Sequence, residues 1–345
     1  NYNAETEELY DGGTLTLTLS GKTGFTATKV WLDQAVEDEV RAAFDKNNED
    51  GTTLEEAIQA ALEASRPTVT FQLWRYREDS TYNQAAQVDG VEVKMELVDG
   101  TSNKYTLTVV PEGASEGEEI DLQEVLDKYD QDGYRYIYCL RETMGTQTEN
   151  GASANSYTQV FGNVVVSDDG TVTITDTLPY GDSGERDTND IGIYHEGTIS
   201  NRLTENTTVD VEKVWQASAF QGQLADVTVV FTLQSRPKEG EYTDTNDGWT
   251  DTGTVAVQTN ITEENMASWT DSATISKYGP LGEELEFRWV ETAVYQGELS
   301  DEDMAAIEGG EELTGRNLLL NGKFTLTCAV EGVEDPVPYH YTSTE

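Results

Sequence analysis

The triplet Lys-Val-Trp occurs twice in this chain of 345 residues, within TKVWLD at 28–33 and within EKVWQA at 212–217. Each copy is followed by an apolar segment that alternates as a strand does, and then by a segment that contains Glu-Thr. The apolar segments lie at 66–75 and 225–237, and the segments with Glu-Thr lie at 134–143 and 285–294. The same order in two places predicts one structural module written twice, about one domain apart.

Strand-like sequence runs through the whole chain. Segments rich in Val, Thr and aromatic residues alternate with a period of two, which is typical of half-buried strands. They lie at 14–21, 68–76, 91–98, 104–110, 134–142, 171–178, 227–234, 285–291 and 323–331. The sequence therefore predicts an all-β protein.

Helical periodicity appears in a few stretches between the strands. Residues 35–64 contain two amphipathic stretches, the second opened by Thr53 with Glu56 three positions later, which is a capping box. Shorter capped helices are expected at 121–129 and 300–308. These helices are interpreted as insertions into the β modules.

The segment DKNNEDGTTLEE, between the first two helical stretches, has the oxygen ligands of a calcium loop. Asp45, Asn47 and Glu49 alternate as such ligands do, but Gly51 falls one position late for the sharp turn of an EF-hand. A helical hairpin is therefore the favoured interpretation, with calcium as the alternative. We predict no metal site and no cofactor for this chain.

Charge and histidine content disfavour several functions. The chain has 66 acidic and 21 basic residues, a formal net charge of −45, which repels phosphate backbones and anionic lipid. His195 and His340 lie in no triad or metal-binding spacing, and no glycine-rich phosphate loop is present. No apolar run approaches the roughly 20 residues that span a bilayer. We expect no nucleic-acid binding, no membrane insertion and no catalysis on an external substrate.

The two cysteines lie in alternating apolar segments. Cys139 falls in YIYCLRE and Cys328 in FTLTCAVE, where a thiol behaves as a small buried hydrophobe. Because they fall in different expected domains, a disulfide between them is not expected.

The repeated motifs resemble the Cna B-type (CnaB) domains of Gram-positive surface adhesins and sortase-assembled pilins. The shared features are the Lys-Val-Trp strand, the Arg-Pro before an apolar strand, Glu-Thr at 142–143 and Ile-Ser-Asn at 199–201. The resemblance implies two tandem immunoglobulin-like (CnaB-type) β-sandwich domains. The first spans 22–204 with large, partly helical insertions, and the second spans 205–345 without its last strand. Residues 1–21 would be a linker or a strand of a neighbouring module.

The resemblance also implies an autocatalytic isopeptide bond in the first domain. Lys29 would be the nucleophile, Asn201 the electrophile and Glu142 the acid that transfers the proton. Burial disfavours the charged form of both a lysine and a carboxyl, so a neutral amine could attack the amide and release ammonia. Taken singly, Lys29 and Glu142 could instead face solvent, and Asn201 could occupy a turn.

Lys213 and Glu291 are the matching candidates of the second domain, with no matching Asn before the closing YHYTSTE. A strand at 14–21 from another copy could complete this domain. The favoured alternative is that a following strand is missing and that 1–20 is the tail of a preceding module. Trp31 and Trp215 are expected to fill the cores of the two domains.

Two functions follow from the resemblance, both at the bacterial cell surface or wall, outside the cell. The first is a structural stalk or pilin-like module, with neighbouring copies of the same protein as partners. The second is an adhesin module that recognises a host glycan or protein through insertions at 34–65, 77–133 and 144–196 of the first domain. The tandem modules and the absence of disulfides favour the stalk.

Overall fold

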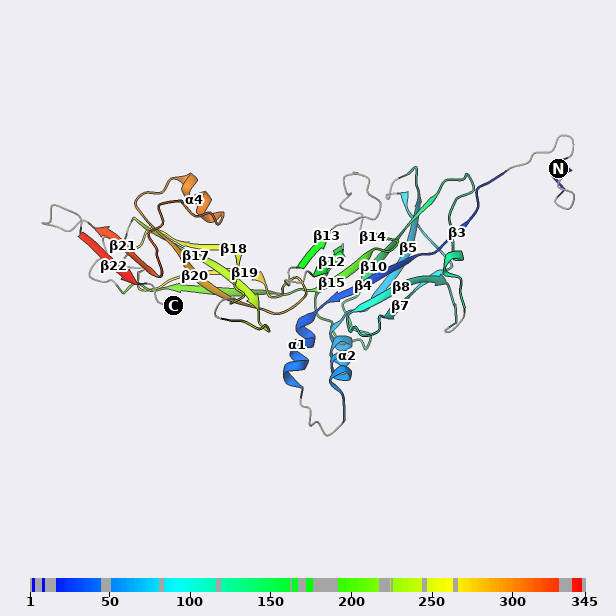
Figure 1. Cartoon of the computed structure of the whole chain (residues 1–345), viewed down its shortest axis with the longest axis horizontal. Helices are drawn as coiled ribbons and strands as arrows, with labels where there is room; N and C mark the ends of the chain where they lie inside the picture. The colour runs from blue at the N-terminus through cyan, green and yellow to red at the C-terminus, as the bar shows by residue number, and fades with distance from the viewer. Residues whose placement is uncertain are drawn as a thin grey trace. The chain divides into compact units, whose positions relative to one another are not determined.

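Strands dominate the computed structural model, as the sequence predicts (Figure 1). The structure describes residues 2–3, 8–9, 17–44, 51–80, 84–115, 119–161, 163–166, 172–175, 192–216, 224, 226–243, 247–262, 266–328 and 337–342. The chain divides into two compact units. The first unit is Asn1–Leu203 with Pro280–Gly282, and the second unit is Thr204–Gly279 with Glu283–Glu345. Among the described residues, no helix is long and apolar enough to cross a membrane.

Two sheets enclose the core of the first unit. One sheet has the order β14-β10-β5-β6 and the other has the order β11-β15-β4-β8-β7. Their bounds are β4 Thr26–Leu32, β5 Val69–Arg77, β6 Ala86–Gln87, β7 Val91–Leu97, β8 Lys104–Pro111, β10 Tyr136–Met144, β11 Tyr157–Phe161, β14 Gly192–Tyr194 and β15 Thr198–Leu203. Buried side chains from both sheets form one cluster, which includes Ala27, Leu73, Leu107, Leu140 and Ile199.

The strand β4 lies in the middle of the five-stranded sheet. It pairs with β8 in antiparallel fashion and with β15 in parallel fashion. In the parallel register Ile199 lies opposite Lys29 and Asn201 lies opposite Trp31. The early strand that carries Lys-Val-Trp and the late strand that carries Ile-Ser-Asn are therefore direct neighbours.

Segments expected to be insertions contribute strands to these sheets. Residues 77–133 contain β7 and β8, and residues 144–196 contain β11 and β14. The expectation of insertions was wrong for these parts, because each of the four strands pairs with a strand that lines the core. Residues 34–65 differ, since they form the helices α1 (Gln34–Ala43) and α2 (Leu54–Ser65), which contact each other (Figure 1).

The helix α2 begins at the expected capping box. The Thr53 side chain accepts from the Glu56 backbone N–H, and the Glu56 carboxylate accepts from the Thr53 backbone N–H. Ile58 and Leu62 are buried along one face of the helix. The candidate calcium ligands Asp45, Asn47 and Glu49 lie outside the described residues.

Short strand pairs complete the first unit. Their bounds are β1 Tyr2–Asn3, β2 Glu8–Leu9, β3 Lys22–Thr23, β9 Leu126–Asp127, β12 Asn163–Val166 and β13 Val172–Thr175. The helix expected at 121–129 was wrong: a short 3-10 turn, Leu122–Glu124, leads into β9. The chain extends there because β9 pairs with β3 and Leu126 enters the core. Residues 17–21 are not a strand, and 14–16 lie outside the described residues.

The second unit is also built mainly of strands. Their bounds are β16 Asn206–Lys213, β17 Val227–Pro237, β18 Thr250–Gln258, β19 Trp269–Ser276, β20 Leu285–Gln296, β21 Lys323–Cys328 and β22 Val337–Thr342. The central sheet has the order β18-β17-β20 and is covered on both faces. One face meets a core that contains Trp215, and the other meets the helix α4 (Asp301–Glu308), which begins at the expected site. This double burial explains why the first five residues of β17, which include Thr228, are all buried.

The two units repeat the same strand register. In the first unit Glu142 on β10 lies opposite Phe71 on β5, and in the second Glu291 on β20 lies opposite Phe231 on β17. The tyrosine of the same Lys-Tyr pair, at 128–129 and at 277–278, forms an isolated bridge just before each of the Glu-bearing strands. The Lys-Tyr turn is a further part of the repeat.

That the second unit lacks its closing strand stays a prediction. Among the described residues, β16 pairs with β19 alone, whereas its counterpart β4 has a parallel neighbour in β15. The last described strand, β22, pairs with β21.

Candidate functional site

The three predicted residues of the first unit meet between its two sheets. Lys29 is on β4, Asn201 on β15 and Glu142 on the facing strand β10. Each occupies the inward row of its strand, because Lys29 alternates with buried Ala27, and Glu142 alternates with buried Leu140. Alternation along the strands therefore places three polar side chains inside an apolar core.

The contacts among the three side chains are direct. Lys29 Nζ lies 3.0 Å from Glu142 Oε1, and Asn201 Nδ2 donates a hydrogen bond of 3.1 Å to the same oxygen. The side chains of Lys29 and Glu142 have no exposed surface, and Asn201 is also fully buried. One carboxylate oxygen thus touches both the lysine nitrogen and the amide nitrogen. Lys29, Glu142 and Asn201 form the Lys-Glu-Asn cluster.

Burial changes the charge state of Lys29. Removal from water lowers the pKa of the ammonium to about 8, even though the Glu142 carboxylate favours the charged form. The nearby Arg66 guanidinium disfavours it further. The ammonium also lies 4.2 Å from the centre of the Trp31 ring. The neutral, nucleophilic amine is therefore far more accessible than for a lysine in water.

Only one of the two polar atoms of the Asn201 amide has a hydrogen-bond partner among the described residues. Its nitrogen donates to Glu142, but its oxygen Oδ1 is buried without a hydrogen-bond partner among the described residues. The resemblance to CnaB domains implies only that Glu142 is the acid that transfers the proton. In the structure the amide nitrogen, and not the oxygen, faces Glu142 Oε1. Leaving a buried acceptor unpaired is costly, and such a group invites a functional explanation.

Gln159 is a site residue that sequence reasoning missed. It lies on β11 directly opposite Asn201, and its Nε2 donates to Glu142 Oε2 at 2.8 Å and to the Glu142 backbone oxygen at 3.2 Å. The alternation in YTQVF at 157–161 could have indicated this strand.

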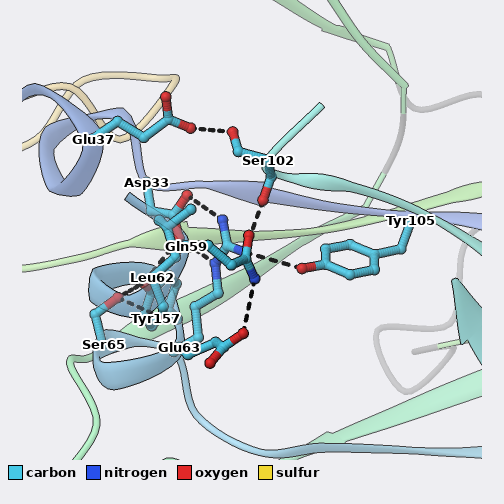
Figure 2. Close-up of polar contacts among 10 residues, drawn as sticks. Asp33, Glu37, Gln59, Leu62, Glu63, Ser65, Ser102, Tyr105 and Tyr157 are labelled. Carbon is cyan, nitrogen blue, oxygen red and sulfur yellow. Dashed lines mark hydrogen bonds and ion pairs between the residues drawn. The ribbon is translucent and has the colours of Figure 1, made fainter. Parts of the chain in front are cut away.

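A second buried polar network adjoins Trp31, at the base of the helices. Arg66 donates to both carboxylate oxygens of Asp33, at 2.7 and 3.0 Å, and both side chains are buried. Arg66 also donates to the Ser102 backbone oxygen and to the Tyr105 hydroxyl (Figure 2). The Tyr157 hydroxyl donates to Asp33 at 3.1 Å. Arg66 of the Arg-Pro motif thus joins the end of α2 to Asp33, which follows β4, and to Tyr105 on β8, while Tyr157 links β11 to the same network.

The second unit has a related ion pair. Lys213 Nζ lies 2.5 Å from Glu291 Oε2, and the two side chains are 15% and 7% exposed. Trp215 lies close to Lys213, as Trp31 lies close to Lys29. The structure thus brings this predicted pair together, but the described part of β16 has no parallel neighbour that could carry an amide.

Most of the other residues singled out in the sequence are buried or make local contacts. Trp31 and Trp215 are buried, as expected. Cys139 is buried and forms no disulfide among the described residues, whereas the side chain of Cys328 lies outside them. His195 accepts from a backbone N–H, and His340 contacts a threonine hydroxyl. No group of three metal-ligating side chains occurs in the described ranges.

Comparison with known proteins gave no match to a family model, to a curated protein or to a solved structure.

The Arg66–Asp33 pair gives a first testable prediction. Arg66→Ala should destabilise the protein by about 3–5 kcal/mol, because it leaves the Asp33 carboxylate buried without its partner. Arg41→Ala is the matched control: it removes an exposed arginine that pairs with Glu37, and should cost under about 0.5 kcal/mol. Chemical denaturation measures both values. If Arg66→Ala lost as little stability as Arg41→Ala, the buried pair would not anchor the helices.

Titration of Lys29 gives a second prediction, in an Asn201→Ala background where no bond to the asparagine can form. The Lys29 pKa is about 8 in the folded protein and 10.5 for the unperturbed group, so the unfolded chain binds more protons between these pH values. Stability should therefore rise with pH across this window, by up to roughly 3 kcal/mol. The control adds Lys29→Met and Glu142→Gln, which removes both partners of the ion pair. Denaturation curves at pH 7.5 and 10.5 that change equally in both proteins would contradict the lowered pKa.

Proposed function

We propose that this chain is a structural stalk or pilin-like module of a bacterial surface adhesin or fibre. In this proposal an autocatalytic isopeptide bond between Lys29 and Asn201 closes the first unit. The observation that carries the proposal is the buried Lys-Glu-Asn cluster, in which one carboxylate oxygen touches both the amine and the amide.

We infer that both units are immunoglobulin-like β-sandwiches of the CnaB type. Support comes from the two sheets around one core in the first unit and from the parallel pairing of β4 with β15. The matched registers of β5 with β10 and of β17 with β20 support one module in two copies. The proposed locations are the cell wall or outer surface, with neighbouring copies or a host-surface ligand as partners.

The groups of the cluster supply and accept every proton that the proposed reaction moves. Lys29 passes a proton to Glu142, and the neutral Nζ attacks Cγ of Asn201. The new bond from Nζ to Cγ forms while the bond from Cγ to Nδ2 breaks. Nζ gives up two of its three protons: Glu142 passes one to Nδ2, so that ammonia leaves, and keeps the other. The fixed positions of the groups supply most of the acceleration.

Product formation consumes the site, so the reaction occurs once per chain and needs no cofactor. It also replaces a buried ion pair by a neutral amide beside a neutral carboxyl. That change removes the desolvation cost of two charges, which favours the product inside an apolar core. The proposed chemistry is thus maturation of the fold and not turnover of a substrate.

The position of the bond suits a load-bearing module. Lys29 is on the first long strand of the unit and Asn201 is on the last, and these strands are parallel neighbours. A pulling force would pass from β4 through the bond to β15. The residues between them, including α1 and α2, would lie outside the load path.

An adhesin remains the second candidate, in which residues 34–65 contribute to recognition of a host glycan or protein. The observation in its favour is that α1 and α2 form a helical pair held to the sheet by the buried Arg66–Asp33 pair. Binding to a glycan or host-protein array that is saturable and lost when 34–65 are replaced by a short Gly-Ser linker would favour this function over the stalk.

Intact mass measurement tests the bond. The wild-type chain should weigh one ammonia less than its sequence, roughly 17 Da. Glu142→Gln keeps the size of the side chain but removes the proton acceptor, so it should keep the full mass. By analogy with a disulfide that closes a long loop, it should also lose roughly 5 kcal/mol of stability. Full mass in the wild-type protein would sink the proposal.

Single-molecule pulling tests the mechanical role. With the bond in place, the part of the first unit between Lys29 and Asn201 should not extend, because the force bypasses it. Glu142→Gln should release this length in one unfolding event. Release of the same length in the wild-type protein at the same force would contradict a load-bearing role.

A further inference from the structure

We propose that Gln159 is a positioning residue that reserves Glu142 Oε1 for proton transfer between Lys29 and Asn201. This inference rests on the proposed isopeptide bond and assigns a role to a residue outside the Lys-Glu-Asn cluster. It explains why an amide side chain from β11 reaches the carboxylate from the other sheet.

The contacts of Gln159 fix the carboxylate at two points. Its Nε2 donates to Glu142 Oε2 at 2.8 Å and to the Glu142 backbone oxygen at 3.2 Å. The two protons of one amide group thus hold the side chain and the main chain of Glu142 together. Rotation of the carboxylate about its last bond would break the shorter contact.

The two carboxylate oxygens of Glu142 therefore have different partners. Oε2 accepts from Gln159, whereas Oε1 lies 3.0 Å from Lys29 Nζ and 3.1 Å from Asn201 Nδ2. A proton taken from Nζ therefore lands on the oxygen that already faces the leaving nitrogen. The carboxyl group can pass it to Nδ2 without turning.

Neighbouring structure holds Gln159 in place. It lies opposite Asn201 in the antiparallel register of β11 and β15, so both side chains lie on the same face. Two residues before it, the Tyr157 hydroxyl donates to Asp33, and the Tyr157 ring packs edge-on against Trp31. The Arg66–Asp33 pair thereby anchors the strand that carries Gln159.

The experiment follows the mass of newly translated chain, quenched in denaturant at set times. Gln159→Met keeps the length of the side chain without its donors. We expect it to slow ammonia loss at least about ten-fold, because a misplaced reacting group costs one to two powers of ten in rate. Thr158→Val changes the exposed neighbour on β11 and should react at the wild-type rate.

A pH profile separates positioning from a merely structural role. Gln159→Glu lacks donors when its carboxyl is ionised, but regains one proton when protonated. Its rate should therefore rise relative to that of Gln159→Met as the pH falls from 8 to 5. Each variant is also unfolded in the Asn201→Ala background to confirm cooperative folding, with Gln159→Leu as a second apolar replacement.

The outcomes are distinguishable. Wild-type chain that loses no ammonia overturns the proposed bond itself. Wild-type chain that reacts while Gln159→Met reacts equally fast overturns only the role of Gln159. A constant rate ratio between Gln159→Glu and Gln159→Met across the pH range also overturns it, because the proton donor would then not matter.

Discussion

The buried contact between Lys29 and Glu142 is the interaction on which the rest of the first unit depends. Two opposite charges without exposed surface face each other between two sheets, where their desolvation is expensive. An apolar pair would fill the same space without that cost, so stability alone does not explain their presence. The lowered Lys29 pKa and the unpaired Asn201 oxygen both indicate a site prepared for chemistry. The proposed bond would neutralise both groups and so remove the desolvation cost of the two charges.

One strand connects the features of the site. Lys29 and Trp31 occupy alternate, buried positions of β4, and Asp33, also buried, follows directly after the strand as the N-cap of α1. Lys29 enters the Lys-Glu-Asn cluster, Trp31 packs beside it, and Asp33 holds Arg66 from α2. Core, cluster and helices therefore depend on the register of β4. The second unit repeats the ion pair with Lys213 and Glu291, but its described strands do not repeat the parallel neighbour that brings the amide.

Alternation predicted many of the strands, because that pattern is local, whereas the three cluster residues followed from the resemblance to CnaB domains. Gln159 was missed because residues 144–196 were interpreted as an insertion, although β11 pairs with β15. The Arg66–Asp33 pair joins positions far apart in the sequence, which no local pattern reveals. The helix expected at 121–129 does not form, because the pairing of β9 with β3 outweighs a weak helical pattern. Such contacts join residues that are far apart in the sequence, so local patterns do not predict them.

Peptide sequencing of the folded wild-type protein tests the central claim most directly. After denaturation and proteolysis, fragmentation of the peptides should identify one branched species in which the Lys29 side chain is joined to the Asn201 side chain. The same digest of Glu142→Gln should yield the two peptides separately. Separate, unmodified Lys29 and Asn201 peptides from the wild-type protein would contradict the account.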